Sequence, residues 1–323
     1  MPKASAVAYP IQGLIKYHGL ADFERRIPYH ASISVCTEPT STHTTLEASE
    51  SIRADTVNID GKDIPVGREQ ARVLKVVDAV RAVAGSQKRV RMVSTSNFPK
   101  YVGFGSSSSG FGALAVAACK VFGVEATVDE MSEFARLGAG SATRSVAGGF
   151  AEWINRGPRS YGRQLAAPGD IPWAIVGVVT HHDVPTEGVH RDAMTSPFFR
   201  ARLEYIEKPL EQMRLAIKNK DSLKIMELAE RDTLNLHAVT MTSKDSLIAW
   251  RGVTVEVMHA VRKMRAEGTP CYFSIDTGAA VYVNTLPEHV DAVEDGLRKI
   301  AGDTPLLRMG VGPAASLVDE HLF

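Results

Sequence analysis

Hydrophobic and polar residues alternate over several short stretches of this chain, and each such stretch predicts a β-strand. Asp60-Gly61 follows one of them, and this dipeptide is typical of a hairpin turn. Strands are expected at 31–37, 55–59 and 90–94, then at 172–180 as a buried run, and finally at 271–276 and 281–284.

Other segments repeat hydrophobic residues at helical spacing. Valines 73, 76, 77, 80 and 83 form one apolar face. Thr127-Val-Asp-Glu130 is a capping box that predicts a helix running to Gly138. Phe111–Phe122 is an Ala-rich run that ends at Gly123, as helices with a glycine C-cap do. In the second half, helices are expected within 197–219, 221–242 and 245–266, and after a further capping box at Thr285-Leu-Pro-Glu288.

Strands and helices occur in both halves without regular alternation, so the pattern indicates an α+β protein. The stretch His181–Pro197 is rich in turn-forming residues and predicts a hinge between the halves. A chain of 323 residues has room for two domains of ordinary size.

Composition narrows the class of protein. Lys+Arg and Asp+Glu both total 37, so no net charge draws the chain toward nucleic acid or a membrane surface. We expect no secretory signal and no transmembrane segment, since Phe111–Val124 is short and contains Lys120. The cysteines Cys36, Cys119 and Cys271 show no metal-binding spacing and suit a reducing cytoplasm.

The stretch Gly103-Phe-Gly-Ser-Ser-Ser-Ser-Gly110 lies between a predicted strand and a predicted helix. A Gly/Ser loop that opens a helix offers backbone N–H groups and a positive dipole end, which favour phosphate. The four hydroxyls add hydrogen-bond donors and possible ligands for Mg²⁺. A serine-rich linker is the alternative, but linkers seldom join a strand to a long apolar helix.

Two common nucleotide-binding loops do not fit this stretch. The Walker pattern needs Gly-Lys-Ser/Thr at its end, whereas Phe111 follows Gly110 here. The dinucleotide fingerprint needs closer glycine spacing in an N-terminal βαβ unit. The sequence therefore predicts phosphate binding of another type.

Four further segments have unusual composition for a purely structural role. They are Gly13-Leu-Ile-Lys16-Tyr17-His18-Gly19, Arg136–Ser145 followed by Gly148-Gly149-Phe150, Arg231-Asp-Thr-Leu-Asn-Leu-His237, and Ser274-Ile-Asp276-Thr-Gly-Ala-Ala280. Together with Asn97-Phe98-Pro99 and the Gly/Ser stretch, they resemble the mevalonate diphosphate decarboxylase branch of the GHMP kinase superfamily. The resemblance extends from Ala8-Tyr9-Pro10 to Gly310-Val-Gly312-Pro313, in family order and spacing.

This resemblance implies two lobes: an N-terminal ribosomal-S5-like, ATP-binding domain over 1–184 and a C-terminal GHMP domain over 185–323, with the active site in the cleft between them. It also implies that ATP and Mg²⁺ are used to phosphorylate the tertiary 3-hydroxyl of a mevalonate derivative. Phosphate and carbon dioxide then leave, and an alkene forms.

The resemblance assigns roles to single residues. Asp276 matches the catalytic aspartate, which accepts or holds the hydroxyl proton, and Lys16 matches the catalytic lysine. Arg144 matches an arginine that binds the substrate carboxylate and aligns it for loss. Tyr17, Ser107 and Ser141 match substrate contacts. The ATP phosphates are assigned to Gly103, Gly105, Ser106, Ser107, Ser108, Ser109 and Gly110, and Mg²⁺ to Ser107.

Taken singly, these residues have structural explanations. A lone lysine often ends a strand at the surface, an arginine can cap a helix, and an aspartate before Thr-Gly often forms a turn. His237 is interpreted as a core histidine, or as one that supports the site from behind, and no catalytic role is assigned to it. All the residues fit one template together, which favours the functional interpretation.

The chain departs from the family where the substrate's phosphate tail would bind. Diphosphate-using members have Gly-Lys-Arg after the lysine-tyrosine motif, whereas this chain has Gly19-Leu20-Ala21. Ala139 replaces a serine, His18 a tryptophan, and Lys100 a small hydroxyl residue. A monophosphate carries roughly two negative charges and a diphosphate roughly three, so the loss of two cations favours the monophosphate.

The sequence thus predicts ATP-dependent decarboxylation of 5-phosphomevalonate to isopentenyl phosphate in an alternative mevalonate route. The alternatives are a diphosphomevalonate decarboxylase, a mevalonate 3,5-bisphosphate decarboxylase, a GHMP kinase that stops at phosphorylation, and a non-enzymatic binding module. Lys16, Arg144 and Asp276 are all present, which favours the full reaction. The resemblance also implies a homodimer; no nucleic acid or membrane partner is expected.

Overall fold

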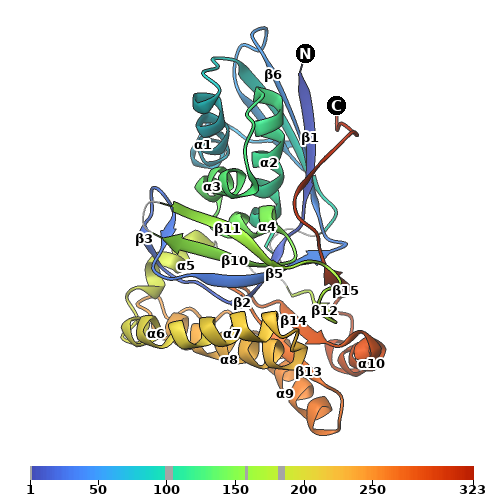
Figure 1. The fold of residues 1–323 in the computed structure, drawn as a ribbon. Coiled ribbons are helices and arrows are strands. Elements are labelled where there is room, and N and C mark those ends of the chain that lie inside the picture. The colour runs from blue at the N-terminus through green and yellow to red at the C-terminus, as the bar shows by residue number, and fades with distance from the viewer. Residues whose placement is uncertain (1, 99–104, 157–158, 181–185) are drawn as a thin grey trace.

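A computed structural model describes residues 2–98, 105–156, 159–180 and 186–323 of the chain. Helices and strands form two lobes stacked along the long axis of the molecule, and both labelled chain ends lie in the N-terminal lobe (Figure 1). The predicted α+β class is confirmed.

The N-terminal lobe is built on a six-stranded sheet in the order β16-β1-β6-β9-β7-β8. All neighbouring strands run antiparallel except β7 and β9, which are parallel. The strands are β1 (Lys3–Ala8), β6 (Thr42–Ser49), β7 (Thr56–Ile59), β8 (Lys62–Asp63), β9 (Arg89–Ser96) and β16 (Ser316–Val318).

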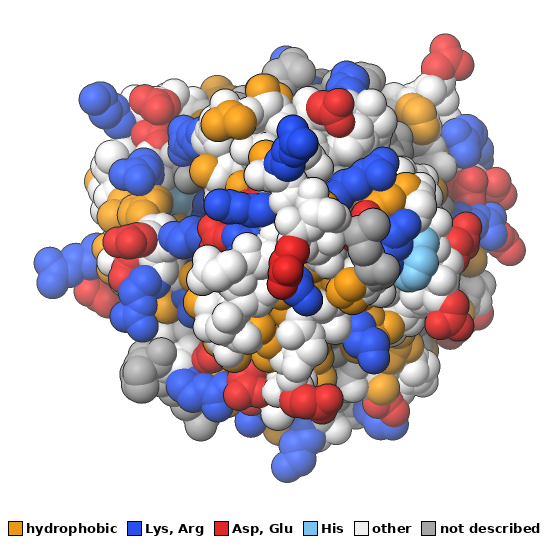
Figure 2. Space-filling model, turned by 90° about the horizontal axis from the view of Figure 1, so that it is seen from above, with side chains coloured by type: hydrophobic (Ala, Val, Ile, Leu, Met, Phe, Trp, Pro, Cys, Tyr) orange, Lys and Arg blue, Asp and Glu red, His pale blue; other side chains and the backbone are white. Residues whose placement is uncertain are grey.

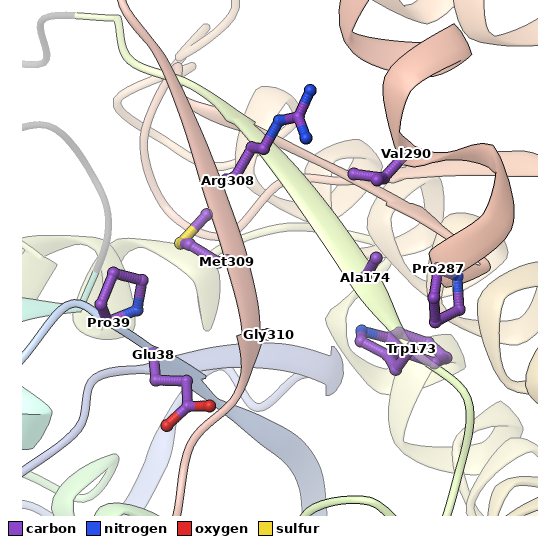
Figure 3. Close-up of a pocket in the computed structure, with 9 residues that line it drawn as sticks. All are labelled: Glu38, Pro39, Trp173, Ala174, Pro287, Val290, Arg308, Met309 and Gly310. Carbon is purple, nitrogen blue, oxygen red and sulfur yellow. The ribbon is translucent and has the colours of Figure 1, made fainter.

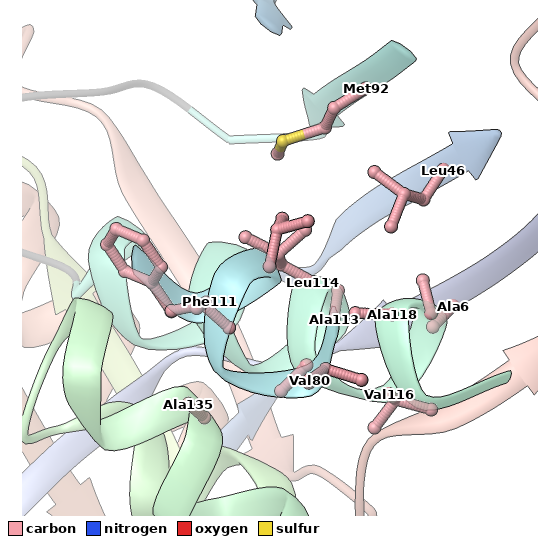
Figure 4. Packing of buried hydrophobic residues seen from close by; sticks show 14 of the residues in the cluster. Ala6, Leu46, Val80, Met92, Phe111, Ala113, Leu114, Val116, Ala118 and Ala135 are labelled. Carbon is pink, nitrogen blue, oxygen red and sulfur yellow. The ribbon is translucent and has the colours of Figure 1, made fainter. Parts of the chain in front are cut away.

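Helix α2 (Ser106–Phe122) lies against this sheet and forms the centre of the lobe's core (Figure 4). Its alanines at 113, 115, 117 and 118 are fully buried, so the helix axis can approach β1 and β6 closely. Leu114 of α2 belongs to the same apolar cluster as Leu46 and Met92 of the sheet. Three further helices pack against α2: α1 (Arg68–Val83), α3 (Val128–Gly138) and α4 (Ala142–Ala147).

A second sheet joins the lobes, in the order β11-β10-β5-β15-β12-β14-β13, with β2 also paired to β5. Strand β15 pairs with β5 from the N-terminal half and with β12 farther along the chain. The strands are β2 (Ile11–Ile15), β5 (Ser32–Glu38), β10 (Phe150–Arg156), β11 (Arg159–Ala166), β12 (Ala174–Val178), β13 (Cys271–Ser274), β14 (Val281–Thr285) and β15 (Leu306–Val311). A separate two-stranded sheet pairs β3 (Leu20–Asp22) with β4 (Ile27–Pro28).

Helices cover the C-terminal part of this sheet (Figure 1). One apolar cluster joins β2 and β5 to α7 and α8, and another joins β12, β13 and β14 to α9 and α10. The helices are α5 (Thr186–Ala193), α6 (Phe199–Tyr205), α7 (Glu207–Lys218), α8 (Ser222–Met241), α9 (Gly252–Ala266), the 3₁₀ helix η1 (Pro287–His289) and α10 (Val290–Ala301).

Most predicted elements are confirmed. Thr127 caps α3 through the predicted capping box, and Gly123 ends α2 in a left-handed conformation at φ 69°. Asp60 and Gly61 both have positive φ in the turn between β7 and β8, as a two-residue hairpin requires.

Three local predictions are wrong. The predicted loop at 106–110 is the first turn of α2, which begins five residues before the apolar run. Thr285 caps no helix, because it ends β14 and donates its hydroxyl to the Pro270 carbonyl at 2.6 Å. The predicted hinge at 181–197 contains helix α5 over 186–193.

The predicted domain boundary between residues 184 and 185 touches residues 181–185, which lie outside the described part of the chain. The division at that point stays a prediction. On the face seen in Figure 2, acidic and basic side chains are interspersed. Within the described ranges, no helix combines the length and apolar character needed to cross a bilayer.

Candidate active site

Lys16 and Asp276 face each other where two strands end. Lys16 directly follows β2, and Asp276 lies two residues after β13. The Lys16 Nζ atom lies 3.9 Å from Asp276 Oδ1. The Lys16 side chain is 5% exposed and that of Asp276 is 21% exposed, so the carboxylate is the accessible partner.

Gly13 brings the Asp276 carboxylate onto the backbone of β2. Its N–H lies 3.1 and 3.2 Å from the two carboxylate oxygens of Asp276. A Cβ atom at position 13 would lie 2.9 Å from Asp276 Oδ1 and 2.8 Å from Lys16 Cγ, which real Cβ atoms do not tolerate. Glycine is therefore required for this contact.

The Lys16 ammonium makes three hydrogen bonds to neutral oxygens. It donates to the Gly13 carbonyl at 2.8 Å, to Ser274 Oγ at 2.9 Å and to Thr233 Oγ1 at 3.0 Å. These bonds fix its position while leaving the carboxylate of Asp276 outside direct bonding distance. The site thus holds a cation beside the accessible carboxylate.

Burial acts on both charges. It lowers the pKa of Lys16, against the opposing effects of Asp276 and Asp232. It also raises the pKa of Asp276, against Lys16, the Gly13 N–H and Arg144. A carboxylate with a raised pKa is a better proton acceptor than an ordinary one.

Arg144 lies beside two aromatic rings near this pair. Its guanidinium carbon is 5.4 Å from the Tyr17 ring centre and 5.5 Å from that of Trp153, and one terminal nitrogen donates to Ser32 Oγ. Burial lowers the Arg144 pKa to about 10, so it stays charged at neutral pH. Its buried Nε has no hydrogen-bond partner among the described residues. An anion is the ligand that would suit it.

Tyr17 lies between Arg144 and the segment that carries Ser141. A Cβ atom at Gly140 would lie 2.9 Å from the Tyr17 hydroxyl and 2.4 Å from Trp153, so these three residues are closely packed. Ser141 is half-buried just before α4, and its side chain caps nothing. The tyrosine ring also stacks on His190 of α5, with centroids 4.8 Å apart.

Positive charges other than Arg144 also act on Tyr17. Burial raises its pKa, and the charges of Arg144, Arg26 and Arg72 oppose that rise. Arg26 and Arg72 donate to the consecutive carbonyls of Leu137 and Gly138 at the end of α3. Three arginine charges therefore act on Tyr17, although residues 20 and 21 are uncharged.

The four serines of α2 divide into two pairs. Ser108 and Ser109 are buried, and their hydroxyls bind within the protein: Ser108 accepts from the Ile11 N–H at 3.1 Å, and Ser109 lies 2.7 Å from Thr42 Oγ1. Ser107 is exposed and Ser106 half-buried at the open first turn. These two hydroxyls are the accessible ones.

Gly105 and Gly110 flank those serines. Gly105 has φ 71° and is the N-cap residue, a conformation that suits glycine. Gly110 lies within the helix, with nothing near the position of a Cβ atom. Gly103 and Lys100 lie outside the described residues. Nucleotide binding by all of these residues stays a prediction.

Sequence reasoning missed several residues that hold the site together. Gly13, Thr233 and Ser274 bond directly to Lys16 or Asp276, and Asp232 and Arg202 hold the Lys16 backbone. Asp232 and Thr233 lie in the segment 231–237 that the sequence singled out without a role. His237 is buried beside Trp250, and burial lowers its pKa to about 4.

A pocket of about 380 Å³ lies elsewhere, between β12, β15 and the start of α10 (Figure 3). Its lining includes Trp173, Pro287, Val290 and Arg308, and no predicted site residue. Among the described residues, no three His, Cys, Asp or Glu side chains are grouped as metal ligands.

Comparison with known proteins shows which families this chain resembles. The model of the diphosphomevalonate decarboxylase-like N-terminal domain matches residues 8–161, and that of the mevalonate 5-diphosphate decarboxylase C-terminal domain matches residues 174–305. Phosphomevalonate decarboxylase of Haloferax volcanii is 42% identical over 98% of both chains.

Solved structures of similar fold match this chain over almost its whole length. Mevalonate diphosphate decarboxylase from Staphylococcus aureus has a TM-score of 0.93 at 28% identity, covering 98% of each chain. A complex of MDDEF with MVAPP, AMPPCP and magnesium has a TM-score of 0.91 at 28% identity, covering 98% of this chain and 99% of that one. The resemblance predicted from the motifs and the two-lobed fold are confirmed. The chain belongs to the diphosphomevalonate decarboxylase-like family.

Proposed function

We propose that this protein catalyses the ATP-dependent decarboxylation of 5-phosphomevalonate, which yields isopentenyl phosphate, ADP, phosphate and carbon dioxide. The observation that carries the proposal is the Lys16–Asp276 pair with the Arg144 guanidinium acting on the same carboxylate. The 42% identity to a phosphomevalonate decarboxylase supports the choice of reaction and substrate.

Asp276 is the group that accepts the proton of the 3-hydroxyl. Its carboxylate is accessible and oriented by the Gly13 N–H, and its raised pKa favours taking a proton. Lys16 keeps that carboxylate ionised in the resting enzyme. The same ammonium stabilises negative charge that develops on the transferred phosphoryl group.

Arg144 binds the carboxylate that is lost as carbon dioxide. A planar guanidinium held beside two aromatic rings presents its N–H groups only in its own plane, which suits a carboxylate. This fixes the direction of the bond that breaks. Once the phosphorylated 3-oxygen leaves, the electron pair of that bond forms the alkene.

ATP with Mg²⁺ supplies the phosphoryl group that turns the 3-hydroxyl into a leaving group. The open first turn of α2 fits its phosphates, since Ser106 and Ser107 offer accessible hydroxyls at the positive end of a 17-residue helix. Ser107 is the candidate Mg²⁺ ligand. The AMPPCP and magnesium bound by the similar MDDEF support the use of ATP and Mg²⁺.

The substrate's phosphate tail would lie beside Tyr17 and Ser141. Leu20 is buried and Ala21 exposed, and neither can pair with a phosphate. The charges of Arg26 and Arg72 reach Tyr17, which suits a singly phosphorylated tail. The diphosphate is the second candidate, because other relatives are diphosphomevalonate decarboxylases.

The test is a panel of mevalonate and its 5-phosphate, 5-diphosphate and 3,5-bisphosphate, with carbon dioxide and ADP measured for each. We expect kcat/KM to be highest for the 5-phosphate, by about a hundredfold or more over the diphosphate, since two lost charged contacts cost about 1.5–3 kcal/mol each. A higher value for the diphosphate would establish the second candidate instead. ADP without carbon dioxide would identify a kinase.

Added cations test the tail assignment. Ala21→Arg, alone and with Leu20→Lys, is expected to raise kcat/KM for the diphosphate relative to the 5-phosphate. Leu215→Lys with Leu223→Arg adds the same charge at two exposed helix positions and is the matched control. Equal shifts in both sets would mean that net charge, and not the tail site, determines the preference.

A homodimer in a reducing cytoplasm is also proposed, from the family resemblance and from three free, buried cysteines. Sedimentation equilibrium tests the assembly. A mass of one chain at micromolar concentration would exclude the dimer.

A further inference from the structure

A buried ion pair binds the backbone of Lys16 at both its N–H group and its carbonyl. The Lys16 N–H donates to Asp232 Oδ2 at 2.7 Å, and its carbonyl accepts from Arg202 Nη2 at 2.8 Å. The same Arg202 nitrogen donates to Asp232 Oδ1 at 2.9 Å, which closes the arrangement. We call these two side chains the Lys16 clamp.

The Lys16 clamp is out of reach of solvent and of a bound substrate. The side chains of Arg202 and Asp232 are each 1% exposed. Arg202 comes from α6 and also donates to Asn235, whereas Asp232 comes from α8. A buried ion pair stabilises little by itself, so the bonds of both of its members to the Lys16 backbone indicate a role in fixing geometry.

Two consecutive residues of α8 hold opposite ends of Lys16. Asp232 binds the lysine backbone, and Thr233 binds the lysine ammonium at 3.0 Å. Thr233 also accepts from the N–H of Ile275, the residue before Asp276. One helix turn therefore sets the relative position of the two proposed reacting groups.

We propose that Asp232 and Arg202 are positioning residues, which fix the Lys16 ammonium against the Asp276 carboxylate by holding the lysine backbone. This inference rests on the proposed function. Neither side chain contacts the substrate, so each acts through Lys16. A displacement of about 1 Å at such a group can cost on the order of a hundredfold in rate.

The clamp also acts through charge, and the sign is testable. The groups that face Lys16 and Asp276 are Asp232, Arg202, Arg144, His237, Tyr17 and Tyr282. The negative charge of Asp232 raises the pKa of both Lys16 and Asp276. Loss of that charge lowers the pKa of both groups. In a pH–rate profile, the acidic limb, set by Asp276, and the alkaline limb, set by Lys16, therefore both move to lower pH.

Asp232→Asn is the first test. An amide has one acceptor oxygen for two donors, so either the lysine N–H or Arg202 loses its bond to residue 232. We expect kcat to fall about 10- to 100-fold with KM values changed less than about threefold, and both limbs of the kcat profile to move to lower pH. An unchanged kcat, or a rise in KM that matches the fall in kcat/KM, would overturn the proposal.

The double variant Asp232→Asn with Arg202→Gln separates geometry from charge. The charge of Arg202 lowers the pKa of Lys16, so its loss should move the alkaline limb back toward that of the unaltered enzyme while kcat stays low. Recovery of kcat would show that the clamp acts by charge alone, which contradicts positioning.

Glu230→Gln is the matched control on the same helix. Glu230 pairs with Arg265 at 2.9 Å and accepts from the Phe273 N–H at 3.1 Å, but it does not contact Lys16 or Asp276. We expect a comparable loss of stability, with kcat and both limbs close to those of the unaltered enzyme. Equal kinetic effects in both variants would reduce the clamp to a general packing role.

A readout that needs no turnover separates this inference from the proposed function. In protein labelled with ¹⁵N-lysine, the Lys16 ammonium signal is titrated with pH. Asp232→Asn should lower that pKa whether or not the substrate panel shows decarboxylation. An unchanged lysine pKa would overturn the clamp, and an inactive panel with a shifted pKa would overturn only the proposed function.

Discussion

At the scale of single residues, the candidate site depends on contacts between unlike groups that different segments supply. The Asp276 carboxylate meets a backbone N–H at 3.1 Å and an ammonium at 3.9 Å. Each contact opposes the rise in pKa that burial causes, so the carboxylate stays usable as a base. Its chemistry is therefore set by neighbours that other segments supply.

Asp276→Asn is expected to keep the fold and to lower kcat by about 10²- to 10⁴-fold, the usual contribution of a general base. An amide of the same shape still accepts from the Gly13 N–H but cannot take a proton. Carbon dioxide release and thermal unfolding are measured, with the exposed Asp303→Asn as control. Turnover near that of the unaltered enzyme would remove Asp276 from the mechanism.

The reacting residues could be predicted from the sequence, whereas the roles of the residues that support them could not, even where those residues stand in the same stretches. Lys16, Arg144 and Asp276 stand in recognisable stretches, and the structure brings them together. Arg202 lies in an ordinary amphipathic segment. Its role follows from a contact between segments far apart in the chain, which spacing cannot show.

At the scale of elements, α2 shows why some boundaries could not be predicted. Glycine and serine have low helix propensity, so residues 106–110 predict a loop. In the fold, Ser108 and Ser109 bond to β2 and β6, and these tertiary contacts extend the helix. Strands β1 and β6 are also missed, because Ala, Ser and Thr give no clear alternation.

The serines of α2 allow a paired test. Ser108→Ala should lower the free energy of unfolding by about 1–3 kcal/mol, because the buried Ile11 N–H loses its acceptor. Ser107→Ala should leave stability unchanged and lower kcat/KM for ATP roughly ten- to a hundredfold, as expected for a lost bond to a charged group. Urea unfolding and steady-state kinetics of both variants are compared. The opposite pattern would mean that the phosphates bind elsewhere.

At the scale of the whole molecule, the end of the chain contributes one strand to each of the two large sheets. Strand β15 lies inside the eight-stranded sheet, and the chain then crosses back so that β16 pairs with β1. On the way it passes Gly148 so closely that a Cβ atom there would lie 2.1 Å from the Ala314 nitrogen. Beyond β16, the Phe323 carbonyl accepts from Lys3, and His321 bonds to Ser5.

Deletion of residues 316–323 should therefore weaken the N-terminal lobe, although it removes no proposed site residue. We expect a loss of about 2–4 kcal/mol in the free energy of unfolding, from several hydrogen bonds at about 0.5–1.5 kcal/mol each. Below the unfolding transition, kcat should stay within about threefold. Urea unfolding measures the loss, and Leu317→Ser, at an exposed position of β16, is a milder control. An unchanged midpoint would mean that this segment only rests on β1.

The crossing strand also constrains the order in which the protein can be completed during synthesis. Residues 306–318 leave the ribosome after all the remaining strands that the structure describes, yet β15 has an internal position in one sheet and β16 covers an edge of the other. Until they emerge, β1 has an open edge and β5 lacks its link to β12. The strand edges of the nascent N-terminal half stay unpaired until β15 and β16 have been synthesised. We expect chaperones to bind at these edges.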